Sequence, residues 1–496
     1  MAGARRASAW LFAAFLLAFS VPLPRYSWNE SSRAALVAAA VDHGTFAIDA
    51  PLQGPWPTGD RARFQGRYYS DKIIGTALLA APGYLLAGWI GGHPPPPWLA
   101  ALCMRIPAET IPGAVGAVLL FLLLVRLRVP LRRAAVATVL SVVGTLWLPY
   151  GTSLYPYVAG IALLLAATHL FLLPPRRMGP LVTSLLGGAV LGGALLLDYV
   201  FGIAVALLGI ARVVAVARDG AASQRAAGPG GWLRPALAHG VALAAGAAPP
   251  LALFALYCQA IFGQWAIPYQ FLENGIFREG MSRGLMGVGA PSLRALWFLT
   301  VHPFRGLFFW SPVVAVAFWG CATWMRDGDP ARRAAGLLGL VALPAYLLFN
   351  AGYYMWWGGY AAGPRFLIPA LPLVLPGLGA LATGDPSGAF PWRWGVALVA
   401  GAVSVALSIP FAFTGVNVPT RWTDRMLLAE WQGASPHLDL LDRATDFYDG
   451  RANPLDWPMA GLVTPGWLGY GVAGLAGLLF LVLVARAVRV GEAATR

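Results

Sequence analysis

The chain has 496 residues, of which 58% are hydrophobic and only 11% are charged. Its mean hydropathy of +0.65 and its many long apolar runs predict a single polytopic membrane domain over residues 1–496, and they exclude a string of soluble modules. The net charge of +14 does not indicate nucleic-acid binding. The predicted topology puts the whole excess of basic residues on the cytoplasmic side, where it sets the orientation and favours anionic lipid headgroups.

The apolar runs predict an all-α protein with about twelve transmembrane helices, held in the inner or plasma membrane with both termini in the cytoplasm. The predicted spans are residues 8–24, 107–125, 134–149, 155–173, 179–197, 199–216, 235–262, 307–325, 334–350, 366–382, 394–413 and 466–485. Arg5 and Arg6 precede the first apolar run, as in a signal peptide. Because Pro22, Pro24 and Arg25 follow it without a small-residue cleavage site, we expect an uncleaved first span.

The first outer loop, residues 25–106, concentrates charge that a hydrophobic chain does not need for folding. Between Trp28 and Lys72 the acids are Glu30, Asp42, Asp49, Asp60 and Asp71. Lys72 is the only lysine in the sequence, because arginine fills every other basic position. A single compact ammonium beside Asp71 and two tyrosines favours a phosphate or carboxylate ligand, and the alternative is a solvated loop charge.

The apolar segment 73–92 resembles a span but is not predicted to be one. The arginines from Arg126 to Arg133, which follow the next span, belong on the cytoplasmic side, and one more crossing would put them outside. We therefore expect a juxtamembrane or re-entrant helix there. Apolar residues at helical spacing between Glu30 and Gly44 predict a second interfacial helix in the same loop.

Other predicted outer segments are less specific. Residues 263–306 combine arginines with closely spaced glycines and predict a flexible loop, which either orders over a substrate or serves as a linker. Residues 414–465 are rich in acids and long enough to form a small cap. The aromatic turn 147–157 is typical of membrane anchoring. Asp198, at the next outer turn, is either solvated or directed toward the site.

The polar residues of the outer face favour one kind of chemistry. Carboxylates can act as general bases for a hydroxyl, lysine and arginine can bind a phosphate leaving group without a metal, and aromatic rings stack on sugars. An enzyme that uses a sugar linked to a lipid phosphate needs this combination. Asp327-Gly328-Asp329 has the form of a metal-binding Asp-x-Asp, but it falls in a short cytoplasmic loop and is predicted to be a turn. No metal and no cofactor are expected.

Several motifs resemble those of the GT-C glycosyltransferases, the integral-membrane superfamily of protein mannosyltransferases and lipid A aminoarabinose transferases. The motifs cover nearly the whole chain in order: NESSR…VDHGTFAID…TGDRARFQGRYYSDKIIG…AAPGYLL in the first loop, FG at 262–263, HPFRGLFFWSP at 302–312 and WWGGYAAGPRFLIPALP at 356–372. The resemblance implies a GT-C fold. It also implies transfer of a sugar, with inversion, from a polyprenyl-phosphate-linked donor to a hydroxyl of a glycan, lipid or protein acceptor on the extracytoplasmic face.

The resemblance implies positions for the catalytic groups as well. Family members carry an acidic residue just after the first span, commonly in an Asp-Glu pair, and Asn29-Glu30 stands at that place here. They also carry a lysine segment before the next helix, which Asp71-Lys72 matches, although Ile73-Ile74 replaces the usual paired prolines. The departure at Asn29 leaves three candidates for the catalytic base. These candidates are Glu30, Asp49 and Asp60.

The remaining predicted site residues would bind the donor or support the site. The predicted phosphate ligands are Lys72, Arg305 and Arg365, and the predicted supporting residues are Arg33, Tyr69, Asp71, His302 and Trp357. Two other functions stay open. A transporter or flippase of lipid-linked sugars would carry ionisable groups in mid-membrane and paired broken helices. A polysaccharide polymerase or ligase with a diphosphate-linked donor would gather more arginines at one outer site.

Overall fold

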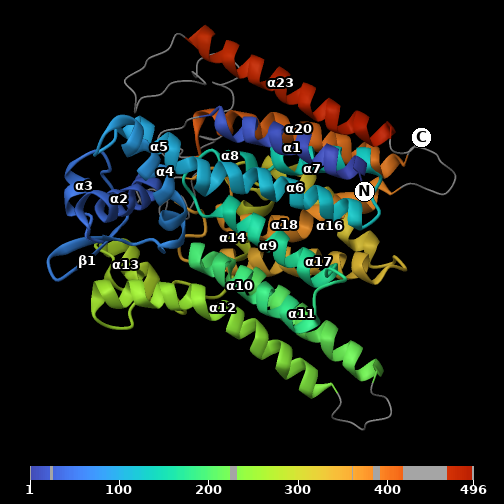
Figure 1. Ribbon diagram of the computed structural model, residues 1–496, viewed down its shortest axis with the longest axis horizontal. Coiled ribbons are helices and arrows are strands. Elements are labelled where there is room, and N and C mark those ends of the chain that lie inside the picture. The colour runs from blue at the N-terminus through green and yellow to red at the C-terminus, as the bar shows by residue number, and fades with distance from the viewer. Residues whose placement is uncertain are drawn as a thin grey trace.

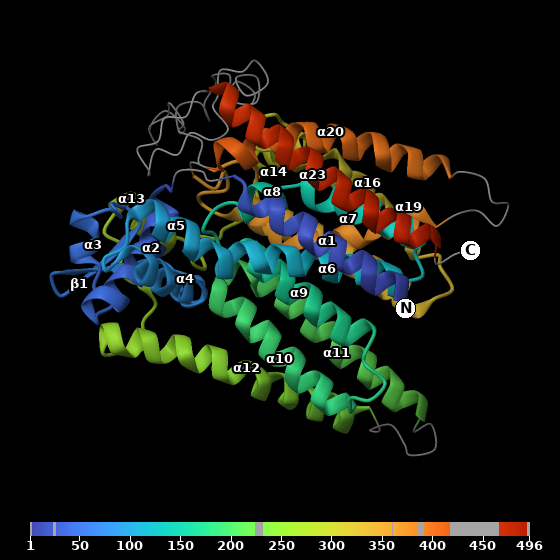
Figure 2. The ribbon, with the colours of Figure 1, turned by 45° about the horizontal axis from the view of Figure 1, so that its top comes forward.

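The structure, a computed structural model, describes residues 2–22, 26–223, 232–359, 361–383, 391–416 and 466–493. A bundle of long helices carries a cap of short helices and one hairpin at one end (Figure 1). The first residues of α1 (Ala2–Ser20) and the last of α23 (Gly466–Ala493) lie at the opposite end of the bundle, and the two helices pack side by side (Figures 1 and 2). The predicted fold class, an all-α polytopic membrane protein, is confirmed.

The bundle is built from helices that share one large apolar core. Besides α1 and α23 they are α6 (Ile111–Arg126), α7 (Leu131–Val143), α9 (Tyr157–Leu172), α10 (Pro180–Leu197), α11 (Gly202–Ser223), α12 (Leu233–Phe262), α16 (Pro312–Trp324), α17 (Pro330–Gly352) and α20 (Trp392–Thr414). Small residues allow close approach between them. A Cβ on Gly188 or Gly246, for example, would meet the backbone of the neighbouring helix, so α10 and α12 pack with almost no space between their backbones.

Eight helices in the described residues are long and apolar enough to cross a bilayer. They are Pro97–Arg126, Pro180–Leu197, Tyr199–Asp219, Leu233–Phe262, Pro330–Gly352, Arg365–Ala382, Trp392–Thr414 and Gly469–Val490. Each corresponds to one predicted span. The predicted spans 8–24, 134–149, 155–173 and 307–325 are not among the eight, because α7, α9 and α16 are shorter than a full crossing and α1 begins with charged residues. The count of twelve therefore stays a prediction.

The predicted span 366–382 is a broken segment, not a plain helix. It consists of the 3-10 helices η4 (Arg365–Ala370) and η5 (Leu375–Gly377) and the short α-helices α18 (Leu371–Val374) and α19 (Leu378–Ala382). Pro369, Pro372 and Pro376 cannot donate backbone hydrogen bonds, which interrupts a regular α-helix. The broken helix is tolerated because protein surrounds it: 83% of residues 365–382 are buried.

The cap contains most of the first outer loop. Its elements are α2 (Trp28–His43), α3 (Asp49–Gln53), β1 (Arg61–Phe64), β2 (Arg67–Ser70), α4 (Gly75–Gly91) and α5 (Pro97–Arg105). Helix α2 is central: its alanines let α4 and the hairpin pack closely on it, and Ile48, Trp56 and Tyr84 complete a second apolar core. Helix α4 packs on α2 and α5 within the cap (Figure 2), and its outer face exposes Leu85, Trp89 and Ile90.

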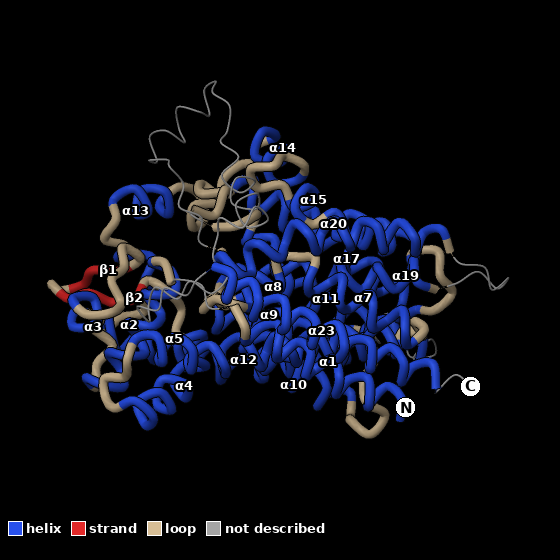
Figure 3. Tube along the Cα trace, turned by 90° about the horizontal axis from the view of Figure 1, so that it is seen from above, coloured by secondary structure: helices blue, strands red, loops and turns tan. Residues whose placement is uncertain are grey.

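The second outer loop, predicted as a flexible segment over residues 263–306, contains regular elements. They are the 3-10 helix η3 (Pro268–Phe271) and the helices α13 (Gly275–Ser282) and α14 (Leu293–Thr300). Figure 3 shows α13 beside the hairpin of the cap. Its glycine-rich turn uses positive φ at Gly284 and Gly287, a conformation that glycine adopts without strain. Most of the predicted outer cap 414–465 lies outside the described residues.

The arrangement predicts which segments share a side of the membrane. A cysteine replacing Arg63, exposed on the hairpin, or His93, which contacts Asp42 in the cap, should react with a membrane-impermeant maleimide in intact cells. A cysteine replacing Gly328, between α16 and α17, should react only after permeabilisation. Background should be low because Cys103, Cys258 and Cys321 are buried. Labelling of His93→Cys from the inner side alone would mean that α4 crosses the membrane.

Candidate active site

Helix α2 fixes the first wall of the site through its N-terminus. Ser27 is the N-cap and Glu30 the N3 residue, so the two form a capping box. The Glu30 Oε2 atom accepts hydrogen bonds from the Ser27 backbone N (3.0 Å) and from Ser27 Oγ (2.7 Å), and its Oε1 atom accepts one from Ser153 Oγ. Glu30 is fully buried. Its carboxylate therefore joins the start of α2 to the turn before α9.

The β-hairpin brings the lysine segment onto α2. Arg61 pairs with Ser70 in the antiparallel register, and the turn residues Gln65 and Gly66 both have positive φ (47° and 81°), as a two-residue hairpin turn requires. At the end of β2, Ser70 Oγ lies 2.8 Å from Ser32 Oγ on α2. This contact places the two residues that follow, Asp71 and Lys72, against the N-terminal half of α2.

Lys72 lies between two carboxylates. Its Nζ atom is 2.8 Å from Asp60 Oδ2 and 3.0 Å from Asp71 Oδ2. The Lys72 side chain is 8% exposed, that of Asp71 is 4% exposed and that of Asp60 is 15% exposed. Asp71 also accepts a hydrogen bond from Ser32 Oγ (3.3 Å). Asp71 is thus the inner partner of the ammonium and Asp60 the outer one, which a substrate can reach more easily.

The two carboxylates differ in proton affinity. Burial raises the pKa of Asp71 above its ordinary value, and the nearby charge of Asp60 adds to this effect, although Lys72 opposes it. Burial also opposes ionisation of Asp60, but the charge and hydrogen bond of Lys72 outweigh it and hold the pKa of Asp60 below its ordinary value. Arg365 and Arg33 lower it further. Asp60 is therefore the carboxylate that stays ionised beside the ammonium.

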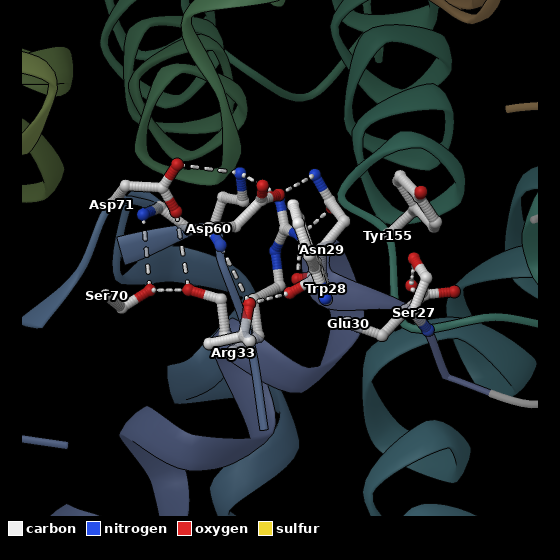
Figure 4. Close-up of polar contacts among 12 residues, drawn as sticks. Ser27, Trp28, Asn29, Glu30, Arg33, Asp60, Ser70, Asp71 and Tyr155 are labelled. Atoms are coloured by element: carbon white, nitrogen blue, oxygen red, sulfur yellow. Dashed lines mark hydrogen bonds and ion pairs between the residues drawn. The ribbon is translucent and has the colours of Figure 1, made fainter. Parts of the chain in front are cut away.

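Arg33 on α2 contacts two residues beside the Lys72 cluster. Its Nη1 atom donates to the backbone O of Asn29 (3.0 Å) and to Asn29 Oδ1, and its Nη2 atom lies 3.9 Å from Asp198 Oδ2. Because Arg33 occupies the amide oxygen of Asn29, the amide nitrogen is directed to Asp60 Oδ2 at 3.4 Å (Figure 4). Asp198, which the sequence left open between solvent and site, faces the site.

Arg365 contributes a half-buried guanidinium on the bundle side. It begins the broken segment, and its Nη1 atom is 3.5 Å from Tyr155 Oη. The guanidinium groups of Arg365 and Arg33 lie 5.7 Å and 5.8 Å from the centre of the Tyr155 ring. Tyr150 and Tyr157 pack on Tyr155 to form an aromatic cluster. The turn predicted to anchor the membrane thus supplies aromatic rings to the site.

Other predicted residues hold the surrounding segments in place. Arg305 donates from Nε to the Trp357 backbone O (3.1 Å), from Nη1 to the Phe304 O (2.8 Å) and from Nη2 to the Gly359 O (3.3 Å), so it binds protein carbonyls. His302 accepts from the Phe304 backbone N (3.1 Å), and burial lowers its pKa. The carbonyl of Trp357 is an acceptor for Arg305. The structure places these three residues together, where the end of the second outer loop contacts residues 357–359.

Tyr69 belongs to β2 of the hairpin, and Asp49, the first residue of α3, contacts the same strand. Both oxygens of Asp49 lie 3.3 Å from the Tyr68 backbone N, and Tyr69 packs at 9% exposure against Phe262 at the end of α12. In the part of the chain that the structure describes, neither residue forms a hydrogen bond or an ion pair with Lys72. The structure therefore brings together Asp60, Asp71, Lys72 and Arg33, while the carboxylates of Glu30 and Asp49 are used in hydrogen bonds that hold α2 and the hairpin.

The hairpin also joins the two outer loops. Arg61 forms an ion pair with Glu273, and the Glu273 backbone N donates to the Arg61 O (3.1 Å). The aromatic rings of Phe64, Phe262 and Phe271 pack together behind this pair. The second outer loop is thus fixed to the same hairpin that carries Lys72.

Sequence reasoning missed three residues of the site: Asn29, Tyr155 and the buried Glu109. Asn29 was treated only as a departure from an Asp-Glu pair. Glu109 falls at the edge of the predicted span 107–125, where a lone acid in an apolar run is itself a signal of function. In the part of the chain that the structure describes, no group of three or more His, Cys, Asp or Glu side chains could hold a metal ion.

The sequence matches no protein-family model, and no curated protein is significantly similar to it. The structure is similar to that of ArnT from Cupriavidus metallidurans bound to undecaprenyl phosphate, with a TM-score of 0.52 and 16% identity over 98% of this chain and 77% of that chain. The apo state of that ArnT gives a TM-score of 0.50, 16% identity, and coverage of 98% and 76%. The chain has the GT-C fold.

The predicted GT-C resemblance is thereby confirmed at the level of the fold. The Archaeoglobus fulgidus oligosaccharyltransferase in the apo form is also similar, with a TM-score of 0.43 and 12% identity over 88% of this chain and 59% of that chain. Identities this low compare architectures and not individual side chains. The roles of residues within this GT-C fold therefore rest on the geometry of the site itself.

The geometry ranks the three candidate bases. Asp60→Asn should lower kcat by about 10²- to 10⁴-fold, because Asp60 is the more exposed, ionised partner of Lys72. Glu30→Gln should stay within a few-fold of the wild type, because glutamine also serves at N3 of a capping box. Asp49→Asn is the matched control, because Asp49 is another carboxylate that contacts the hairpin. Steady-state sugar transfer would check this, and a large loss in Glu30→Gln with an active Asp60→Asn would assign the base to Glu30.

Proposed function

We propose that the protein is a glycosyltransferase that moves a sugar from a polyprenyl-phosphate-linked donor to an acceptor hydroxyl, with inversion, on the extracytoplasmic face. The single observation that carries this proposal is the placement of Lys72 between Asp60 and Asp71 at the junction of cap and bundle. One group of that centre can receive a proton and another can hold an anionic leaving group. The GT-C fold supports the proposal, since the similar ArnT was solved with undecaprenyl phosphate.

The proposed reaction is a single displacement at the anomeric carbon. Asp60 accepts the proton of the acceptor hydroxyl as the new carbon–oxygen bond forms. The bond between the anomeric carbon and the phosphate oxygen breaks, and the polyprenyl phosphate leaves with the bonding electrons. Lys72, with Arg365 nearby, stabilises the charge that develops on that phosphate. Inversion follows because attack and departure take place on opposite faces of the same carbon.

The distribution of buried charge supports an enzyme over a transporter. Buried ionisable residues in contact with cap or outer-loop segments are Glu30, Arg33, Asp71, Lys72, Arg105, Glu109 and Arg305. Of the described residues within the bundle, Arg212 and His239 are also buried, but Ser184 links them at the other end of α10, α11 and α12. A transport pathway would favour ionisable groups near the middle of the bundle.

Lys72 offers the most direct test of the donor phosphate site. Lys72→Ala should lower both donor affinity and kcat, with a total loss of about 2–4 kcal/mol in transition-state stabilisation, as for one preorganised donor. Lys72→Arg should recover affinity better than rate, because the longer planar guanidinium cannot take the position of the ammonium between the two carboxylates. Transfer from a synthetic polyprenyl-phosphate sugar, with donor binding measured separately, checks this. Wild-type binding and turnover in Lys72→Ala would contradict the proposal.

The pH dependence follows from the lowered pKa of Asp60. A base with its pKa below the ordinary aspartate value of 3.8 is ionised throughout the neutral range, and its ion pair with Lys72 is lost only as pH falls through that lowered pKa. We therefore expect kcat/KM to show no acid limb between pH 8 and about pH 5. An acid limb near neutrality, measured with the same donor, would point to a base other than Asp60.

A further inference from the structure

A buried acid lies where the cap meets the bundle. Helices α5 and α6 are continuous through a π-helix, η1 (Ile106–Thr110), and Glu109 is fully buried within it. Pro107 cannot donate a backbone hydrogen bond, which accommodates the wider turn. Single π-turns inside α-helices are frequent at functional sites. The reaction proposed above does not use Glu109.

Within the described part of the chain, Glu109 has unpartnered hydrogen-bond acceptors, and two nearby arginines have unpartnered donors. Neither of its carboxylate oxygens has a hydrogen-bond partner among the described residues, and the same holds for the Nε atoms of Arg33 and Arg105. Burial opposes ionisation of Glu109, and the cations that favour it are Arg33 and then Arg105. An unsatisfied buried polar group is costly, and a buried charge without a counter-charge is more so. Opposite charges on Glu109 and on the two arginines would offset part of this cost.

The two arginines are held differently. Arg105 is fixed by backbone carbonyls on both sides, since its Nη1 donates to Pro22 O and to Thr152 O (2.7 Å) and its Nη2 donates to Ser20 O (3.0 Å). Arg33 lies on the side of the proposed reaction centre, where its Nη groups face Asn29 and Asp198. Glu109 therefore lies near two arginines of the cap, one fixed to backbone carbonyls and the other beside the proposed reaction centre.

We propose that Glu109 is the buried acidic partner of Arg33 and Arg105, and that it is a positioning residue for the reaction centre. The path is short. Glu109 holds Arg33, Arg33 occupies the amide oxygen of Asn29, and the amide nitrogen of Asn29 then faces Asp60 Oδ2. The catalytic part of this inference rests on the function proposed above, whereas the charge network itself does not depend on it.

A double-mutant cycle tests the proposal. Glu109→Gln keeps the shape and removes the charge, and it should lower kcat by about 10- to 100-fold, as for an outer partner that orients a reacting group, with KM for the donor changed less than about two-fold. In an Arg33→Gln background the same substitution should change kcat by less than about two-fold, because Glu109 then has no site-side arginine to hold. Glu109→Asp should restore part of the wild-type rate.

Thr110→Val is the matched control. Thr110 is buried in the same π-helix and its Oγ1 atom also has no partner among the described residues, but it carries no charge. It should leave kcat within about two-fold of the wild type. An equal loss in Thr110→Val, or an effect of Glu109→Gln that is the same with and without Arg33, would overturn the proposal, because either result would mean a packing role alone.

A second readout needs no substrate. Thermal unfolding of the same variants in lipid nanodiscs should show that Glu109→Gln lowers the midpoint in the wild-type background and lowers it clearly less with Arg33→Gln. Coupling in the unfolding midpoint, with no transfer by any variant or by the wild type, would support the charge network and refute the proposed function. Independent effects in both readouts would refute the network itself.

Discussion

The burial of Lys72 is the constraint on which the site depends. A lysine whose side chain is only 8% exposed is stable as an ammonium only if opposite charge replaces its lost hydration, and the oxygens of Asp60 and Asp71 lie 2.8 Å and 3.0 Å from it. Removing Asp60 would take away the carboxylate that stays ionised beside the buried ammonium, so Lys72 and Asp60 are coupled. Because Asp60 precedes β1 and Asp71 follows β2, the ion pairs also close the base of the hairpin. The chemistry and the local fold therefore share the same contacts.

The junction of cap and bundle is polar where most of the molecule is apolar. Glu30 with Ser153, Arg33 with Asp198 and Arg105 with Thr152 each join a cap residue to the bundle. Such contacts have definite geometry, unlike the contacts of apolar side chains, so they orient the cap as well as attach it. They also place fixed charges and dipoles in a buried region, where electrostatic interactions are stronger than in water. The apolar faces that α4 and the long helices expose are suited to lipid on the other sides.

The comparison of the three candidate bases illustrates how much the residue types could indicate. The unusual lysine and the cluster of acids predicted a site in the first loop, and Lys72, Asp71 and Arg33 lie close together there. The choice between Glu30, Asp49 and Asp60 could not follow from the sequence, because each is an acid near the predicted outer face. It depends on which carboxylate is already used by a helix cap or a strand, and that is visible only in the hydrogen bonds of Ser27 and Tyr68.

By itself, the sequence determined the membrane class, the helical fold, the position of most long spans and the loop that carries the charged residues. These features depend on composition and on local periodicity, which are properties of neighbouring residues. Only the tertiary structure decided that Asp198 and Tyr155 face the site from segments far apart in the chain, that Glu109 is buried where the cap meets the bundle, and that the span 366–382 is broken. The physical reason is that buried charges must find partners across the fold, and no local pattern specifies which distant residue supplies the partner.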